Sequence, residues 1–478
     1  MPADPTMPAK LTMPAKLTMN AVSVGRILIV GLGTLVVPLD SSVNVGFPAI
    51  VAAFGLEIPE IQWVVIAYVL TQTSLLLIFG RVGDMFGYRR VFLIGCASST
   101  VAFIFCSLAA SYPWLLAARI LQGVGAGLVL SCGPALVTGL FPEGDRARVL
   151  GLYTMIFGVG AALGLLTAGL LVRQFGWSAV FWYRAPLSAL AFVLVLFLLP
   201  PSPPRGEPQS FDALGGFLLA GSIAATLFSF NRLPHATLQP WILAACVASA
   251  IGGFACFIRH QNRVAQPIIN PAYFRGVDFA LINAAHALVQ LAGFSVNLLG
   301  PFFLAGFSAL SVPATGLVLA CSAFGIIVAA PIAGRLAGRV SPERFFLVGM
   351  AAVALGQAAI ALGAARVDVG WIALAFFVQG FGIGIFQTAY LDVVTATLPR
   401  AERGVAGALG MLTRTMGTVS GATLLLLVYA SVRAWGEAQG WPAPDAFLLG
   451  LRMGFAAAAA IPATLLVIVL WRGGRWLR

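Results

Sequence analysis

Long apolar runs recur along the whole chain, and each has about the length that an α-helix needs to cross a bilayer. They are too long, and alternate too little, to be strands of a membrane barrel. The chain is 60% hydrophobic and only 9% charged, with a mean hydropathy of +0.97, which excludes a water-soluble core. We therefore expect an all-α membrane protein with fourteen transmembrane helices. The runs cover residues 27–49, 61–80, 91–110, 114–140, 148–172, 177–199, 212–230, 240–258, 277–304, 312–333, 345–365, 370–396, 405–432 and 446–471.

The cations are distributed unevenly between the loops. If the N-terminus is cytoplasmic, twenty of the 28 Lys and Arg residues fall on the inner side, four fall on the outer side and four lie within the runs. Lys and Arg favour the cytoplasmic side, and a missed or extra helix would invert this bias from that point onward. The tally therefore supports fourteen spans with both termini cytoplasmic, in an inner (plasma) membrane of bacterial type. The outer four are Arg173, Arg232, Arg366 and Arg433, and those within the runs are Arg119, Arg184, Arg414 and Arg452.

The composition argues against several classes of function. The net charge of +12 is scattered between apolar runs instead of forming one basic face, so we expect no nucleic-acid partner. The six cysteines lie inside apolar runs without a CxxC pair or a histidine at metal-binding spacing, so we expect no metal site. A P-loop and an HExxH motif are both missing from the sequence, and we expect neither a cofactor nor an enzyme.

Two motifs occur twice, in corresponding places of the two halves. GRVGDMFGYRR at 80–90 returns in degraded form as GRLAGRVSPER at 334–344, and QGVGAG at 122–127 returns as QGFGIG at 379–384. Parallel repeats of this kind build transporters whose substrate site lies between the halves near the bilayer midplane. The predicted organisation is a disordered cytoplasmic tail (1–26), a six-helix bundle (27–200), a linker with two extra helices (201–275), a second six-helix bundle (276–471) and a cytoplasmic tail (472–478).

Four motifs stand at corresponding helices of one known family. They are PLDSSVNVGFP at 38–48, GRVGDMFGYRR at 80–90, LAARILQGVGAG at 116–127 and QPIINPAYFRGVDF at 266–279. Together they resemble the major facilitator superfamily, and within it the fourteen-spanner drug:proton antiporter branch. The resemblance covers residues 27–471 and implies the major facilitator fold, with two six-helix bundles and two inserted helices.

The chain also departs from that family's pattern. The antiporter motif of the fifth helix normally holds a Gly-Pro and a Gly-Gly pair, whereas this chain has Gly164-Leu165 and Ala168-Gly169. Arg184 stands in the sixth helix where the family usually has Asn. Both departures keep open a transporter that is specific for one anionic metabolite, by export or by uptake.

Three charged residues are predicted to lie at similar depths in the membrane. Each costs about 2.5 to 3.5 kcal/mol near the bilayer centre, so each needs a partner, water or a task. Counted along their helices, Asp40, Arg119 and Arg184 agree in depth within roughly 5 Å, and can meet. The resemblance assigns proton coupling to Asp40 and Arg119, and the alternative is a permanent ion pair that joins two helices. Arg184 either completes a cationic pocket for an anionic or zwitterionic substrate or is a second partner of Asp40.

Further polar and aromatic residues are candidates for the substrate cavity. Asn283, His286, Gln290 and Asn297 share one face of their predicted helix, which we expect to point into the cavity. His286 could titrate near neutral pH or could be a hydrogen-bonded packing residue. Asp392 is either a gate contact or a solvated helix end. The predicted cavity residues are Asn44, Tyr68, Gln122, Arg184, Asn283, His286, Gln290, Tyr390 and Arg414.

The loop after the second helix is a candidate gate. Its glycines permit a tight turn, and an acid gains nothing from the positive-inside rule. By resemblance, this loop locks the cytoplasmic side of the two halves when the transporter faces outward. The predicted gate residues are Gly80, Asp84, Gly87, Arg89 and Arg90.

These patterns favour a proton-coupled secondary transporter that exports amphipathic organic compounds by alternating access. Its partners would be a small-molecule substrate, protons and the lipid bilayer, and we expect a monomer. A non-transporting membrane sensor on the same fold is the alternative from another class, and the charged residues Asp40 and Arg119 argue against it.

Overall fold

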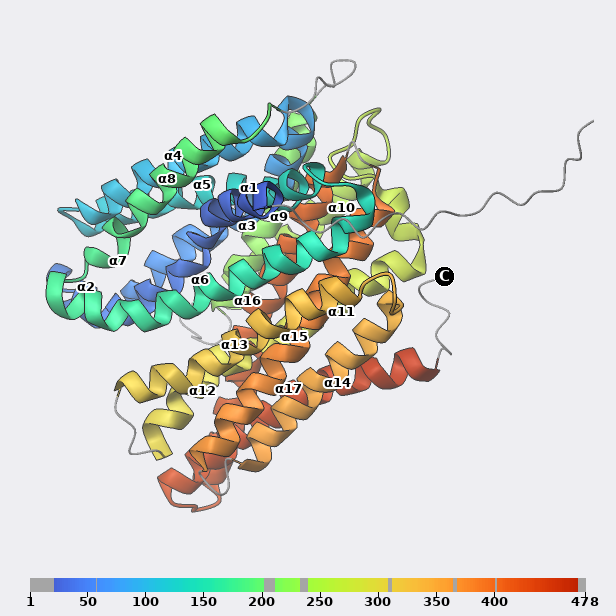
Figure 1. The fold of residues 1–478 in the computed structure, drawn as a ribbon. Coiled ribbons are helices and arrows are strands. Elements are labelled where there is room, and N and C mark those ends of the chain that lie inside the picture. The colour runs from blue at the N-terminus through green and yellow to red at the C-terminus, as the bar shows by residue number, and fades with distance from the viewer. Residues whose placement is uncertain are drawn as a thin grey trace, which may run out of the picture.

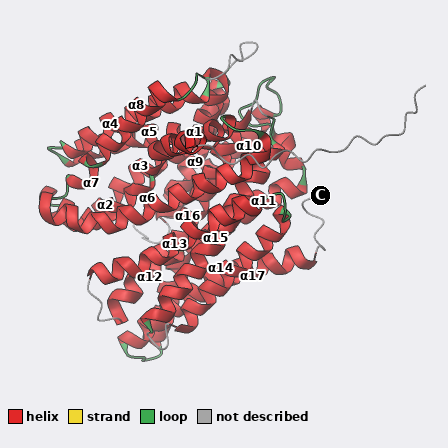
Figure 2. Cartoon of the chain, in the orientation of Figure 1, coloured by secondary structure: helices red, strands yellow, loops and turns green. Residues whose placement is uncertain are grey.

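The computed structural model is built from helices joined by short loops (Figure 2). It describes residues 21–56, 58–201, 211–232, 240–307, 312–363, 368–399 and 402–471, so the predicted tails lie largely outside the described residues. Within these ranges no strand forms, apart from one isolated bridge between Ala337 and Val340, and the predicted all-α fold is confirmed.

The helices of the first part of the chain are α1 (Ala21–Leu35), η1 (Pro38–Asp40), α2 (Ser41–Phe54), α3 (Ile58–Phe86), α4 (Tyr88–Ser107), α5 (Tyr112–Gly139), η2 (Glu143–Asp145), α6 (Arg146–Phe175), α7 (Ala179–Trp182), α8 (Arg184–Leu198), α9 (Ala213–Arg232) and α10 (Pro240–Gln261). Those of the second part are η4 (Pro271–Arg275), α11 (Val277–Gly293), α12 (Ser295–Phe307), α13 (Val312–Leu336), α14 (Pro342–Gly363), α15 (Val369–Thr397), α16 (Arg403–Ala438) and α17 (Ala443–Trp471).

Twelve helical segments of the described chain are long and apolar enough to cross a membrane. The two inserted runs are helices as well: α9 has 20 residues and α10 has 22 residues. They pack against each other, and α9 also packs against α3 and α16. The twelve segments are thus supported by length and composition, and the count of fourteen spans remains a prediction.

The two repeated halves lie on opposite sides of the molecule. Helices α1–α8 lie in the upper part of Figure 1, and α12, α14 and α17 lie in the lower part. Between the two sides, α6 packs along α13, while α3 and α5 pack along α16. The residue boundaries predicted for the two bundles remain predictions.

Glycines allow the backbones of the two sides to approach closely. A Cβ at Gly151 of α6 would meet the carbonyl of Ala330 in α13, and a Cβ at Gly334 of α13 would meet the carbonyl of Ala147 in α6. Helices in lipid associate through such small residues because close approach increases their van der Waals contact. At these two positions the α6–α13 contact is therefore made by backbone, whereas Gly158 of α6 faces the side chains of Ile326 and Ile327.

Three of the predicted membrane helices are interrupted, which the apolar pattern did not reveal. The run at 27–49 forms α1, a 3₁₀ turn at Pro38–Asp40 and α2. Pro38 has no backbone N–H and its ring disfavours a continuous helix, so the chain turns here. The run at 177–199 divides at Tyr183 into α7 and α8, and the run at 277–304 divides at Phe294 into α11 and α12.

Side-chain amides support the break between α11 and α12. Gln357 donates its Nε2 hydrogen to the carbonyl of Ala292 over 2.9 Å, and Gln379 donates to that of Gly293 over 3.2 Å. A break inside a bilayer needs such partners, because lipid offers none to the freed backbone groups. Gln379 belongs to the repeated QGFGIG motif, which gives that motif a structural task.

The predicted span count can be tested by labelling single cysteines in a full-length chain whose native cysteines are replaced. If α9 and α10 both cross the membrane, Arg232→Cys at the end of α9 reacts with an impermeant maleimide in intact cells, and Arg263→Cys reacts only after permeabilisation. Reaction of both positions from the same side would show that the pair does not form two complete spans.

Candidate functional site

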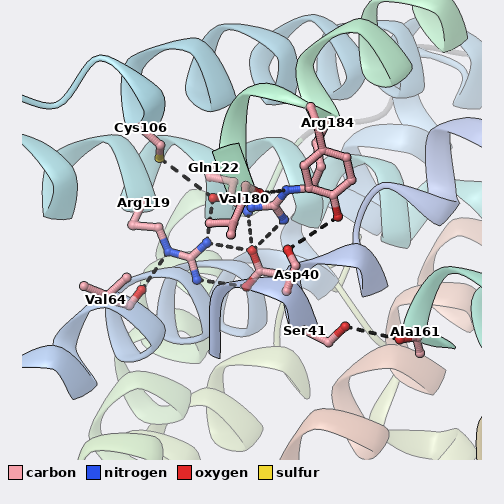
Figure 3. A network of polar contacts seen from close by, with 11 residues as sticks. Asp40, Ser41, Val64, Cys106, Arg119, Gln122, Ala161, Val180 and Arg184 are labelled. Carbon is pink, nitrogen blue, oxygen red and sulfur yellow. Dashed lines mark hydrogen bonds and ion pairs between the residues drawn. The ribbon is translucent and has the colours of Figure 1, made fainter. Parts of the chain in front are cut away.

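Asp40 lies at the helix break between η1 and α2, where its carboxylate meets a guanidinium from α5. Arg119 Nη1 lies 2.7 Å from Asp40 Oδ1, and Arg119 Nη2 donates to Oδ2 over 2.9 Å (Figure 3). The side chain of Arg119 is fully buried, and that of Asp40 is 14% exposed. This two-pronged geometry is the strong form of an ion pair, and it brings together the two residues predicted for proton coupling.

A second guanidinium and an amide complete the coordination of this carboxylate. Arg184 Nη1 lies 2.7 Å from Asp40 Oδ1, and Gln122 Nε2 donates to the same oxygen over 2.9 Å (Figure 3). Gln122 Oε1 also accepts a hydrogen bond of 2.7 Å from Arg119. Arg184 is thus a partner of Asp40, as one of its two predicted roles required.

Backbone carbonyls and aromatic rings hold the two guanidinium groups in place. The Nε of Arg119 donates to the carbonyl of Val64, and the Nε of Arg184 donates to that of Val180. The guanidinium of Arg119 lies 4.4 Å from the centre of the Tyr68 ring, and that of Arg184 lies 4.6 Å from the centre of the Phe103 ring. Such cation–π contacts offset part of the cost of burying a cation.

This cluster carries an excess of positive charge. Two buried guanidiniums share one carboxylate, and the Nη2 atom of Arg184 is buried without a hydrogen-bond partner in the described chain. Neutralising the carboxylate would leave two adjacent cations in a medium of low dielectric, which is costly. The cluster therefore favours ionised Asp40 as long as both arginines remain in contact with it.

A cavity of about 500 Å³ opens beside Asp40, with walls from both sides of the molecule. Four of the predicted site residues line it: Asp40, Tyr68, Gln290 and Arg414. The inserted helix α9 contributes Leu227 to the wall. The cavity is largely apolar with few polar groups, which is the usual character of a small-molecule site.

The other predicted cavity residues whose side chains are described do not line this cavity. The side chains of Gln122 and Arg184 donate hydrogen bonds to the carboxylate of Asp40, and neither residue belongs to the cavity wall. Asn283, His286 and Tyr390 lie in a separate buried cluster. Asn44 lies in α2, but its side chain is outside the described residues.

That separate cluster packs α11 against α15 and α16. The rings of His286 and Tyr390 are stacked with centroids 3.8 Å apart, and His286 Nδ1 lies 2.8 Å from Thr413 Oγ1. The hydroxyl of Tyr390 donates to Asn283 Oδ1 over 2.7 Å. These partners fit the packing role that was one alternative for His286, and the polar face of α11 reaches the cavity only at Gln290.

Several polar cavity residues were not singled out from the sequence. Thr415 and Thr418 of α16 line the cavity with Arg414, and Ser322 and Gln72 join them from α13 and α3. Hydroxyl and amide side chains are common in membrane helices, so their types alone gave no signal. Arg414 and Thr418 are four residues apart on one helix, and this spacing could have identified the face of α16 that lines the cavity.

Asp84 joins the two sides of the molecule at the predicted cytoplasmic end. Its side chain is 3% exposed and accepts the backbone N–H of Gly404 (2.9 Å) and of Val405 (3.2 Å), at the first turn of α16. The hydroxyl of Tyr88 also donates to Asp84. An acid at a helix N-terminus satisfies free N–H groups and complements the helix dipole.

The remaining predicted gate residues contribute in different ways. Gly80 packs against the backbone of Gly404, and Gly87 has φ +95°, a conformation that other residues rarely adopt. Arg89, by contrast, donates to the carbonyl of Leu196 in α8, on its own side of the molecule, and Arg90 is exposed. The bond from Arg89 to Leu196 thus stays within its own side of the molecule.

Ion pairs add to the closure of this end. Arg146 Nε lies 2.8 Å from Asp392 Oδ1, and Arg403 Nη2 lies 2.6 Å from Glu143 Oε1. Asp392 is therefore a contact between the two sides, and its interpretation as a solvated helix end is wrong. From the sequence, Arg146 and Arg403 were counted only as loop cations, and Glu143 was not singled out.

The linker that follows α10 also reaches this end of the molecule. The hydroxyl of Tyr273 donates to Glu402 Oε2 over 3.1 Å, immediately before α16. Burial, with the charge and hydrogen bond of Glu402, raises the pKa of Tyr273 to about 12. Tyr273 therefore stays a neutral hydrogen-bond donor at physiological pH.

Membrane-spanning helices surround a largely apolar cavity, and contacts between two repeated sides close one end of the molecule. These features define a membrane transporter and not an enzyme. The family model of the Major Facilitator Superfamily matches residues 30–422 and 282–475. The chain belongs to the Major Facilitator Superfamily.

Similar proteins extend over most of the chain. The tetracenomycin C resistance and export protein of Streptomyces glaucescens is 28% identical, covering 85% of this chain and 76% of its own length. The riboflavin transporter RibZ of Clostridioides difficile (strain 630) is 25% identical, covering 86% and 89%. The solved structure of the human organic anion transporter MFSD10 (TETRAN) aligns with a TM-score of 0.66, covering 94% of this chain and 99% of that one. At 13% identity, that likeness shows the fold alone.

Asp40→Asn is expected to lower the free energy of unfolding by about 3–5 kcal/mol, because it leaves two buried guanidiniums without a carboxylate. Arg184→Gln should cost less, since Asp40 keeps its two-pronged pair with Arg119. Thermal unfolding of the purified protein in detergent measures both changes. The control is Glu437→Gln, which removes an exposed ion pair with Arg433. Equal losses in Asp40→Asn and in this control would contradict the assignment.

Asp84→Asn is expected to open the end of the molecule at which α16 begins. It removes the charge that holds two N–H groups of α16, a loss of about 1–2 kcal/mol, or roughly tenfold in the closed population. Spin labels at the exposed positions Phe86 and Ser341 report the distance across this end. Glu437→Gln, at the opposite end of α16, serves as the control. An unchanged distance distribution in Asp84→Asn would exclude a locking role.

Proposed function

We propose that this chain is a proton-coupled secondary transporter that exports amphipathic organic compounds by alternating access. The observation that carries the proposal is a membrane-embedded carboxylate, Asp40, which both lines a cavity and contacts two arginines. Ionisable residues inside a membrane are expensive and mark proton and substrate pathways.

Export of organic compounds is supported by relatives and by the cavity. One relative is named for resistance to tetracenomycin C and its export, and the cavity of about 500 Å³ has room for a compound of several rings. The riboflavin transporter among the relatives supports the alternative, a transporter for one metabolite. Cavity walls that are mainly apolar favour the broader class of amphipathic compounds.

Proton coupling would follow from the competition for Asp40. In the arrangement described here, Arg119 and Arg184 stabilise the ionised carboxylate. A proton would bind when a movement of α1 or α2 separates Asp40 from these cations, because burial then favours the neutral acid. The helix break at Pro38 supplies the place where such a movement can occur without distorting a continuous helix.

Alternating access would use the contacts at the predicted cytoplasmic end. Asp84, with the pairs Arg146–Asp392 and Arg403–Glu143, holds the two sides together at that end. The arrangement corresponds to a transporter closed toward the cytoplasm. Release of these contacts would open the cavity to the cytoplasm for loading.

The proposal also includes the branch of the family, the membrane in which the protein lies and its oligomeric state. Helices α9 and α10, where the fourteen-spanner branch has its inserted pair, support membership of that branch. We place the protein in a bacterial inner membrane, as a monomer with both termini cytoplasmic. Bacterial relatives and the charge tally support this location.

The coupling is tested in proteoliposomes loaded with a pH-sensitive dye and a panel that includes tetracenomycin C and riboflavin. Efflux of a substrate should acidify the compartment that it leaves, and Asp40→Asn should abolish this acidification while binding persists. Glu437→Gln, a change outside the cavity, should leave both unchanged. Alkalinisation of that compartment would indicate symport, and normal coupling in Asp40→Asn would refute the role of Asp40.

A further inference from the structure

Arg414 lines the cavity from α16 and has no acidic partner. Its guanidinium forms no ion pair with any residue in the described part of the chain. Its Nη1 atom is buried and makes no hydrogen bond there. An unpaired cation inside a membrane protein is costly, so a stable structure keeps one only with compensation or a task.

The protein compensates for this cation only in part. The guanidinium lies 4.0 Å from the centre of the Phe157 ring, which α6 supplies from the other side of the molecule. A cation–π contact of this kind stabilises the cation only modestly and does not satisfy the hydrogen-bond donor at Nη1. Phe157 thus orients Arg414 without neutralising it.

Asp40 does not provide the missing negative charge. It is the only acidic residue among those that line the cavity, and both of its oxygens are bonded to arginines. Around the cavity, three guanidiniums therefore stand against one carboxylate. In a site of low dielectric, this excess of positive charge attracts an anion and disfavours a cation.

The surroundings of Arg414 combine polar and apolar groups in the way an amphipathic anion requires. Thr415, Thr418 and Gln290 line the same cavity and make its surface near Arg414 polar. Both threonine hydroxyls donate to backbone carbonyls of α16, and the Gln290 amide donates to Gln387, so Arg414 holds the free donor. Facing parts of the wall are aliphatic or aromatic, including Ile66, Val69 and Phe294 among others. A ligand could place a charged end at Arg414 and its apolar body against the other wall.

We propose that Arg414 is an anion-accepting subsite and that the preferred substrates are lipophilic compounds bearing one carboxylate. A planar carboxylate matches the fork of guanidinium donors and would neutralise the cation that the protein leaves unpaired. The inference rests on the proposed transport function for its biological meaning, but the binding preference itself is independent of proton coupling.

The test compares 2-naphthoate with 2-naphthamide, two compounds of the same shape that differ in charge, by calorimetric titration of the full-length protein in lipid nanodiscs. The wild-type protein is expected to bind naphthoate at least about tenfold more tightly, because its carboxylate would accept charge-assisted hydrogen bonds from Arg414 that the neutral amide cannot match. Arg414→Gln should remove this preference and change naphthamide binding by no more than about twofold.

Two further variants make the result specific. Arg414→Lys keeps the charge but loses the planar fork, so it should retain part of the preference for naphthoate. Arg433→Gln removes an arginine from the exposed end of the same helix and should bind both compounds like the wild type. Gel filtration and thermal unfolding establish whether each variant is folded. If Arg414→Gln does not fold, the comparison between Arg414→Lys and the wild type tests the proposal instead.

The outcomes separate this inference from the proposed function. Equal binding of the two compounds by the wild type would overturn the subsite, and so would an unchanged preference in Arg414→Gln. In either case the contact between Arg414 and Phe157 would serve packing alone. A preference that depends on Arg414, in a protein that moves no protons with any compound, would uphold the subsite and refute the proposed coupling.

Discussion

The single carboxylate of Asp40, shared by two buried guanidiniums, is the interaction on which the interior of this protein depends. Lipid cannot solvate any of these charges, so η1, α5 and α8 are held together by the need to keep them in contact. The interruptions of the helices at Pro38 and Tyr183 bring Asp40 and Arg184 to the same place. These two buried ion pairs therefore lie where the helices are interrupted.

Helix α16 links the predicted cytoplasmic end of the molecule to the cavity. Its first turn is held by Asp84, and Arg414 lines the cavity ten residues after Gly404, about 15 Å farther along a rigid helix. A ligand that pulls on Arg414 acts on the same element that closes the predicted cytoplasmic end. Binding and gating can thus influence each other through one helix, without a longer chain of intermediate contacts.

Length, hydropathy and motifs were sufficient to predict the fold and the meeting of Asp40, Arg119 and Arg184. The helix breaks escaped prediction because hydropathy does not distinguish a continuous helix from two shorter ones, although Pro38 was a local signal. His286 and Tyr390 lie on polar or aromatic positions that could face a cavity or a neighbouring helix, and only the packing of α15 and α16 decides between the two. The pair Arg146–Asp392 joins residues far apart in sequence, which no local pattern could match.

The glycines at the crossing of α6 and α13 have a mechanical consequence. Where Gly151 and Gly334 meet the facing carbonyls, the two surfaces present backbone instead of interlocking side chains. Interlocked side chains resist sliding because each must leave its rotamer, whereas two smooth backbone surfaces can pivot with few such changes. At these two positions the crossing therefore offers little resistance to a change in the angle between α6 and α13.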